Sequence, residues 1–299
     1  MQLTRLAEAF RSLGYPVAEG EPMSRHTSFK VGGPADMFVT VPDGKGAAAV
    51  LYRCREAGIP VFVMGNGSNL LVSDEGIEGV VLKIETTAPP ASGEAGEIVC
   101  PAGLPVKKLC LFARDQALSG LEFAFGIPGT VGGGVYMNAG AYDGCMADVL
   151  KEVRVLTPAG DVCDLGVDEL DLGYRHSRIA DEGLVVLSAT FALTRADGEK
   201  IRQKMDDLTH RREEKQPLDL PSAGSTFKRP EGHFAGKLIT DAGLRGYQVG
   251  GAAVSKKHAG FVVNVGGATA AVHAVIEHVQ AEVERQFGVR LQPEVRFLG

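Results

Sequence analysis

The spacing of apolar and polar residues predicts helices and strands along most of the chain. Leu3, Leu6, Phe10 and Leu13 recur at helical spacing and predict an amphipathic helix over residues 1–14. Further helices are predicted over 43–58, 104–118, 198–215 and 269–287. Apolar runs bounded by turn residues predict strands at 37–42, 61–64, 79–84, 97–102, 151–157, 161–165, 184–194, 248–255, 261–265 and 295–298.

Several of these helices have recognisable end signals. Asp43 is expected to cap the helix that Gly58 ends, because a carboxylate accepts the unpaired amides of a first turn. Thr269 is expected to cap the last helix, and Gly288 to end it. Pro158 to Gly160 separates two strand signals and predicts a hairpin.

Two stretches rich in proline and small residues predict domain boundaries, at 86–97 and at 216–227. We expect a first lobe over 1–86, a second lobe over 87–205 and a C-terminal domain over 206–299, with a final strand that can return to the first lobe. Since helices and strands follow one another in mixed directions, the expected fold class is α+β.

Composition narrows the partners. The chain has 299 residues, 44% of them hydrophobic and 23% charged, with a net charge of −6. Without a sustained basic face, neither nucleic acid nor an anionic membrane is an expected partner. No stretch reaches the roughly 18 apolar residues that a membrane-spanning helix needs.

The cysteines and the N-terminus indicate the compartment. The five cysteines lack the paired spacing of a disulfide framework or of a CxxC zinc site, so no metal site is expected. The N-terminal pattern lacks the apolar core of a signal peptide. We therefore expect a cytoplasmic protein.

Two glycine-rich segments are the strongest functional signal. Residues 125–142 read FGIPGTVGGGVYMNAGAY, and residues 64–74 read MGNGSNLLVSD. Glycine has no side chain, so such segments let backbone amides approach a diphosphate or a flat ring. The pair predicts one dinucleotide held between them. The candidate cofactor-binding residues are Gly65, Asn66, Gly67, Ser68, Asn69, Gly126, Pro128, Gly129, Thr130, Gly132, Gly133 and Asn138.

The common nucleotide folds do not fit these segments. Leu70 stands where the third glycine of the Rossmann fingerprint belongs, and the residues that follow lack helical periodicity. No P-loop is present either. We therefore expect loops, and not a helix dipole, to hold the dinucleotide, as in a flavin-binding fold of two α+β lobes.

Three further segments carry reactive side chains: Arg175 in GYRHS, Ser225 in AGSTFKRP and Glu294 in PEVRFLG. Taken in order with the two glycine-rich segments, and with RHTSFKVGGPAD at 25–36 and KHAGFVVN at 257–264, they resemble the UDP-N-acetylenolpyruvoylglucosamine reductases, the MurB family. The resemblance covers nearly the whole chain, and the short C-terminal domain is similar to that of the smaller subgroup.

The resemblance implies a fold and a reaction. The fold would be a two-lobed FAD-binding domain of the PCMH/vanillyl-alcohol-oxidase type plus a smaller C-terminal domain for the UDP-sugar. Non-covalent FAD would take hydride from NADPH and reduce the enolpyruvyl group of UDP-N-acetylglucosamine enolpyruvate to UDP-N-acetylmuramate. This step belongs to peptidoglycan precursor synthesis, and so to cell wall biogenesis, cell shape, cell cycle and cell division.

The resemblance also implies residue roles. Arg175 would stabilise charge on the substrate carboxylate together with Glu294, which would contact that carboxylate or a partner cation. Ser225 would donate the proton. Substrate contacts are expected from Arg175, Lys228, Arg229 and His258.

Two other readings stay open. One is another FAD oxidoreductase of the same fold that acts on a small hydroxy acid or alcohol, and the other is a non-catalytic UDP-sugar or flavin-binding protein. The second would not need Arg175, Ser225 and Glu294 together. A monomer or a weak homo-oligomer is expected.

Overall fold

The computed structural model describes residues 2–299, so Met1 of the predicted first helix lies outside the described residues. The chain forms two compact units. The first unit comprises the residues up to Ala18, Met37–Asn66 and Gly79–Arg212, and the second comprises Glu19–Asp36, Gly67–Glu78 and Glu213–Gly299. The division into three domains at 86 and 205 stays a prediction.

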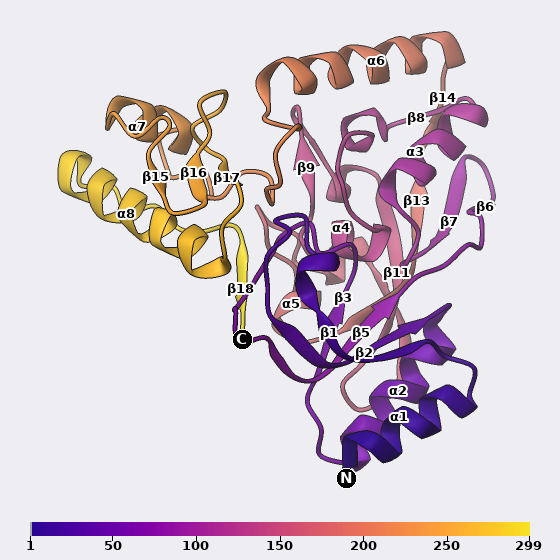
Figure 1. Ribbon diagram of the computed structural model, residues 1–299. Helices are drawn as coiled ribbons and strands as arrows, with labels where there is room; N and C mark the ends of the chain where they lie inside the picture. The colour runs from indigo at the N-terminus through magenta and orange to yellow at the C-terminus, as the bar shows by residue number, and fades with distance from the viewer. Residues whose placement is uncertain (1) are drawn as a thin grey trace. The chain divides into compact units, whose positions relative to one another are not determined.

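Helices and strands are mixed throughout (Figure 1). The helices are α1 (Gln2–Ser12), α2 (Gly44–Glu56), α3 (Val106–Asp115), α4 (Val131–Tyr136), α5 (Arg178–Asp181), α6 (Gly198–Lys215), α7 (Ala235–Asp241) and α8 (Thr269–Phe287). The strands are β1 (Val17–Pro22), β2 (Pro34–Val41), β3 (Val61–Met64), β4 (Leu70–Val72), β5 (Ile77–Ile84), β6 (Ala91–Ser92), β7 (Glu97–Pro101), β8 (Leu118–Ser119), β9 (Gly140–Ala141), β10 (Gly144–Cys145), β11 (Leu150–Leu156), β12 (Val162–Gly166), β13 (Val185–Ala192), β14 (Thr194–Arg195), β15 (Gln248–Val249), β16 (Ala252–Val254), β17 (Val262–Asn264) and β18 (Arg296–Leu298). The predicted α+β class is confirmed.

The first sheet has the order β1-β2-β5-β3, and α1 and α2 lie beside it (Figure 1). One core joins the apolar side of α1, through Phe10, to Val50 of α2 and to Val39 and Val80 of the sheet, all of them fully buried. The Asp43 carboxylate accepts the Gly46 amide at 2.9 Å, so the predicted cap is confirmed.

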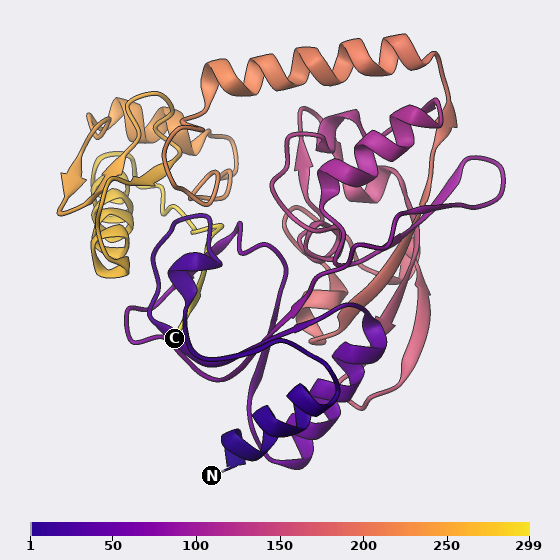
Figure 2. The same cartoon turned by 45° about the vertical axis from the view of Figure 1, so that its right-hand side comes forward.

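The second sheet of the first unit has the order β12-β11-β13-β7-β6. β11 and β12 form the predicted antiparallel hairpin. Helices α3 and α4 pack into the same core as this sheet, through residues such as Leu109, Val131 and Val135. Figure 2 shows the magenta helix α3 beside the strands of the sheet. The sheet therefore fixes the position of α4, which lies inside the longer glycine-rich segment.

In the second unit, β15, β16 and β17 form an antiparallel sheet that shares a core with α7 and α8. The final strand, β18, pairs in parallel with β4. Helix α8 begins and ends where predicted, and Gly288 ends it with φ 68°.

The predicted cap of α8 is wrong. The N-cap residue is Ala268, and the Thr269 hydroxyl donates to Val72 O at 2.6 Å. The first-turn amides of Thr269 and Ala270 donate instead to the Asp74 carboxylate, each at 2.9 Å. A side chain from a distant segment therefore does the work of a local cap.

No helix among residues 2–299 is long and apolar enough to cross a membrane.

Candidate active site

The longer glycine-rich segment is partly helical, and here the expectation of a loop is wrong. Residues Val131–Tyr136 form α4, and Thr130 caps it, since its Oγ1 accepts the Gly133 amide at 3.3 Å. Three glycines disfavour a helix, but Val131 and Val135 are fully buried and α4 contacts β13. Tertiary packing therefore overrides the low helix propensity of glycine.

Most glycines of this segment lie so close to other parts of the protein that a side chain would overlap them. A Cβ on Gly132 would lie 2.9 Å from the Cβ of Ala102, and a Cβ on Gly126 would lie 2.9 Å from Cδ of Arg212. A Cβ on Gly65 would overlap the Thr130 hydroxyl. The two glycine-rich segments thus meet at Gly65 and Thr130 in the first unit. Gly133 differs, because it is exposed and its Cβ would meet only Thr130 Oγ1, at 3.4 Å.

Arg212 is a candidate that the sequence did not single out. Its side chain packs on Gly126, and burial lowers the pKa of its guanidinium. Its neighbour Arg211 is exposed and pairs with Asp207 at 2.9 Å. In the sequence both belong to one charged helical run, so only burial distinguishes them. A half-buried guanidinium beside the glycine-rich segment suits an anionic ligand.

The shorter glycine-rich segment, residues 64–74, contacts the segment that contains Ser28. Gly67 has φ 62°, and its carbonyl accepts the Ser28 amide at 3.1 Å. Ser28 Oγ is buried without a hydrogen-bond partner among the described residues. An orphaned buried hydroxyl beside such a loop fits a ligand-binding role.

Asn69 holds the segment that carries Glu294. Its side-chain amide donates to Glu294 O at 3.0 Å, and its own carbonyl accepts the Arg296 amide at 3.0 Å. The side chain expected to bind the cofactor therefore fixes the backbone at Glu294.

Ser225 and Glu294 lie on neighbouring stretches of chain in the second unit. The Glu294 amide donates to Thr226 O at 2.8 Å, and Phe227 pairs with Pro293. Thr226 and Phe227 are buried, whereas Ser225 is exposed and Glu294 is half-buried. The structure thus brings these two predicted catalytic residues together.

Arg175 belongs to the first unit and occupies a tight turn. Gly173 and His176 pair across the turn, and Arg175 has φ 57°, which is unusual for a residue with a side chain. One guanidinium nitrogen donates to Gly140 O at 3.4 Å, and the guanidinium lies 5.3 Å from the centre of the Tyr174 ring.

The other predicted substrate-binding side chains differ in their surroundings. Lys228 is half-buried, and the Arg229 guanidinium lies 4.1 Å from the centre of the Phe234 ring. Burial lowers the pKa of His258, whose Nδ1 accepts the Gly260 amide at 3.1 Å. Gly260 O in turn accepts the Thr226 amide at 2.8 Å, so the His258 turn supports the backbone next to Ser225.

Comparison with known proteins decides among the three functional hypotheses. Residues 35–166 match the model of an FAD binding domain, and residues 216–298 match the C-terminal domain of UDP-N-acetylenolpyruvoylglucosamine reductase. A reductase of that name from Lachnoclostridium phytofermentans is 51% identical over 284 residues, with 93% of this chain and 92% of the relative covered. The chain belongs to the UDP-N-acetylenolpyruvoylglucosamine reductase family.

Other relatives agree with this assignment. The Clostridium perfringens reductase is 51% identical over 279 residues, covering 93% of this chain and 91% of the relative. The crystal structure of the Thermus caldophilus reductase superposes with a TM-score of 0.80 at 32% identity, covering 95% and 99% of the two chains. The predicted family and the FAD-binding fold are confirmed, and the chain is an FAD-dependent oxidoreductase.

Proposed function

We propose that this chain reduces the enolpyruvyl group of UDP-N-acetylglucosamine enolpyruvate to UDP-N-acetylmuramate with NADPH, in peptidoglycan precursor synthesis. When bound, FAD supplies the hydride relay between NADPH and the sugar substrate. Within the chain, the observation that best supports this reaction is the backbone pairing of the Thr226 and Glu294 segments, which sets the Ser225 hydroxyl and the Glu294 carboxylate on neighbouring stretches of chain.

The three reactive side chains have separate tasks in this proposal. Hydride addition to the vinyl group leaves negative charge next to the substrate carboxylate. Arg175 binds that carboxylate, because a guanidinium stays charged and forms two parallel hydrogen bonds. Glu294 contacts the same carboxylate or a cation beside it. Ser225 donates the proton that completes the reduction; its exposed position in the second unit gives a substrate access to the hydroxyl.

The substrate diphosphate would be bound by cations of the second unit. Lys228 is the strongest candidate, because it is half-buried and lies two residues after Thr226, whose carbonyl accepts the Glu294 amide. Arg229 would bind the diphosphate while its guanidinium stays stacked on the Phe234 ring. His258, neutral because burial lowers its pKa, would offer a hydrogen bond and not a charge.

Non-covalent FAD would lie against the two glycine-rich segments. In the first unit, the exposed backbone at Gly133 and the half-buried guanidinium of Arg212 support this placement. In the second unit, the orphaned Ser28 hydroxyl beside Gly67 supports a ligand contact of the shorter segment. Gly65, Gly126 and Gly132 would shape the segments by letting protein atoms pack closely. We further propose a cytoplasmic enzyme, monomeric or weakly self-associating, that acts in cell wall biogenesis and so in cell shape and division.

The test separates the two half-reactions by stopped-flow. Ser225→Ala should leave flavin reduction by NADPH intact and slow re-oxidation by the UDP-sugar by about 10²-fold or more, the usual contribution of a positioned general acid. Ser222→Ala, three residues earlier in the same segment, is the matched control and should change neither rate. If Ser225→Ala slows the NADPH step and spares the sugar step, the proton-donor assignment is wrong. If no UDP-enolpyruvyl sugar re-oxidises the flavin of the wild-type protein but a small hydroxy acid or alcohol reduces it, the proposed substrate is wrong.

A further inference from the structure

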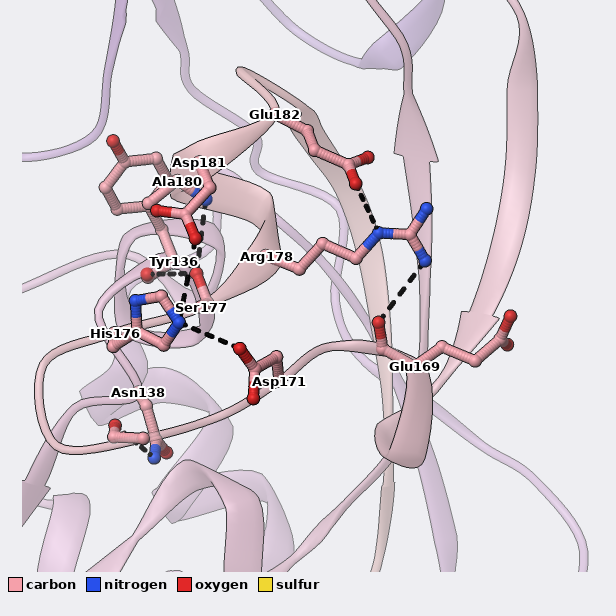
Figure 3. Close-up of polar contacts among 11 residues, drawn as sticks. Tyr136, Asn138, Glu169, Asp171, His176, Ser177, Arg178, Ala180, Asp181 and Glu182 are labelled. Carbon is pink, nitrogen blue, oxygen red and sulfur yellow. Dashed lines mark hydrogen bonds and ion pairs between the residues drawn. The ribbon is translucent and has the colours of Figure 1, made fainter.

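The turn that carries Arg175 is held at both ends by the end of α4 (Figure 3). At one end, Asn138 Nδ2 donates to Gly173 O at 3.0 Å. At the other end, Ser177 Oγ donates to Tyr136 O at 2.6 Å. Tyr136 is the last residue of α4, and Asn138 follows two residues later.

Both clamping side chains are removed from water. Ser177 is fully buried, and Asn138 is 6% exposed. Asn138 is itself fixed, because its Oδ1 accepts the Ala147 amide at 3.0 Å. Its amide group is therefore oriented by one backbone partner and presented to the other.

The ion pairs of His176 hold the turn more weakly. His176 lies 3.1 Å from Asp171 and 3.6 Å from Asp181, but these carboxylates are largely exposed. Exposed ion pairs hold a backbone poorly. The buried contacts at Gly173 and Ser177 therefore restrain the turn more than these ion pairs do.

The turn needs such a restraint. Arg175 has φ 57°, a conformation that a residue with a side chain adopts at a cost. Strain of this kind persists only where the surroundings impose it. Without the two clamps, the residues around Arg175 would relax toward an ordinary turn and the guanidinium would move.

We propose that Asn138 and Ser177 are positioning residues, which fix the backbone of residues 173–177 so that the Arg175 guanidinium meets the substrate carboxylate. This proposal rests on the assignment of Arg175 under the proposed function. It gives Asn138 a role different from the cofactor contact expected from the sequence.

The experiment compares holoenzyme variants by stopped-flow of both half-reactions and by flavin content. Asn138→Asp keeps the acceptor for the Ala147 amide and removes the donor to Gly173 O. It should retain FAD, leave reduction by NADPH within about 2-fold, and slow re-oxidation by the UDP-sugar by about 10²-fold, the cost of a small misplacement of a reacting group. Ser177→Ala should act in the same direction and tests the proposal separately should Asn138→Asp fail to fold. Asp43→Ala removes a comparable side-chain to backbone bond from the cap of α2 and should spare both rates.

A double-mutant comparison distinguishes failure of the positioning role from failure of the role assigned to Arg175. In an Arg175→Ala background, Asn138→Asp should cause little further loss, because the clamp acts only through Arg175. Multiplicative losses, unchanged re-oxidation in Asn138→Asp, or loss of FAD from that variant would overturn the positioning role. If Arg175→Ala itself re-oxidises normally, the role assigned to Arg175 fails instead.

Discussion

We predict that Arg175→Gly is more stable than Arg175→Ala, because the backbone at this position favours glycine. We also predict that Arg175→Gly is slow in re-oxidation by the UDP-sugar, because the reaction needs the arginine side chain. Arg175→Gly and Arg175→Ala both remove the 3.4 Å bond to Gly140 O and the contact with the Tyr174 ring. The difference between the two variants therefore isolates the backbone.

The magnitude follows from φ 57°. Alanine in the left-handed region costs about 1–2 kcal/mol. Glycine avoids that cost but loses about 0.5–1 kcal/mol more conformational freedom on folding. The glycine variant should then be more stable than the alanine variant by roughly 0.5–1 kcal/mol, which corresponds to a Tm about 2 °C higher in a unit of this size.

The assay is urea unfolding at saturating FAD. Because the chain contains no tryptophan, far-ultraviolet circular dichroism is the suitable probe. The same pair of substitutions at Gln203, on the exposed side of α6, is the control and should give the ordinary order, with alanine the more stable.

Two results would refute the reasoning. If Arg175→Ala is more stable than Arg175→Gly, the left-handed backbone does not strain the turn. If Arg175→Gly is stable and still re-oxidises with the UDP-sugar at the wild-type rate, the reaction does not need the arginine side chain, and its function does not explain the strained backbone.

Three further predictions concern the loops and caps around the site. Gly65→Ala should destabilise the first unit by about 1–3 kcal/mol through overpacking, and Thr130→Ala should relieve much of this loss in the double variant; equal losses in both backgrounds would contradict the contact. Asp74→Ala should cost about 1 kcal/mol by uncapping α8, and an unchanged urea midpoint would contradict that role. Burial holds the pKa of His258 in the folded protein below 6.5, so on acidification the unfolded chain binds a proton at this residue before the folded chain does. The free energy of unfolding should therefore fall as the pH drops below 6.5. His258→Gln should reduce this acid sensitivity, as measured by the pH dependence of the urea midpoint.

The regular helices were predictable because their signals are local. Helices α6 and α8 have the predicted bounds, since both carry apolar residues at helical spacing and Gly288 marks the end of α8. Helix α4 was not predictable in this way, because its three glycines conceal a helix that buried valines and β13 stabilise. The cap of α8 was misassigned for a related reason, since Asp74 lies 195 residues from the amide it accepts.

The candidate site was predictable as a set of segments but not as a set of contacts. The order of the motifs identified Ser225 and Glu294, and the family resemblance supplied their expected roles. No spacing in the sequence predicts that Glu294 N donates to Thr226 O, because a pairing between distant segments depends on the fold of the whole second unit. Arg212 was missed because charge alone does not separate a half-buried arginine from an exposed one in the same helix.

Asn69 and Asn138 change how the motifs themselves should be understood. Both stand in glycine-rich segments, where a dinucleotide is the expected partner. Asn69 instead binds the backbone of Glu294, and Asn138 binds that of Gly173, two residues before Arg175. An asparagine amide can donate and accept at once, so it can join two loops whose backbones have no regular pairing. The segments expected to hold the cofactor are therefore also the supports of the segments that carry Glu294 and Arg175. A substitution in either segment can affect catalysis without touching FAD, and flavin content must be measured beside rate before a cofactor role is assigned.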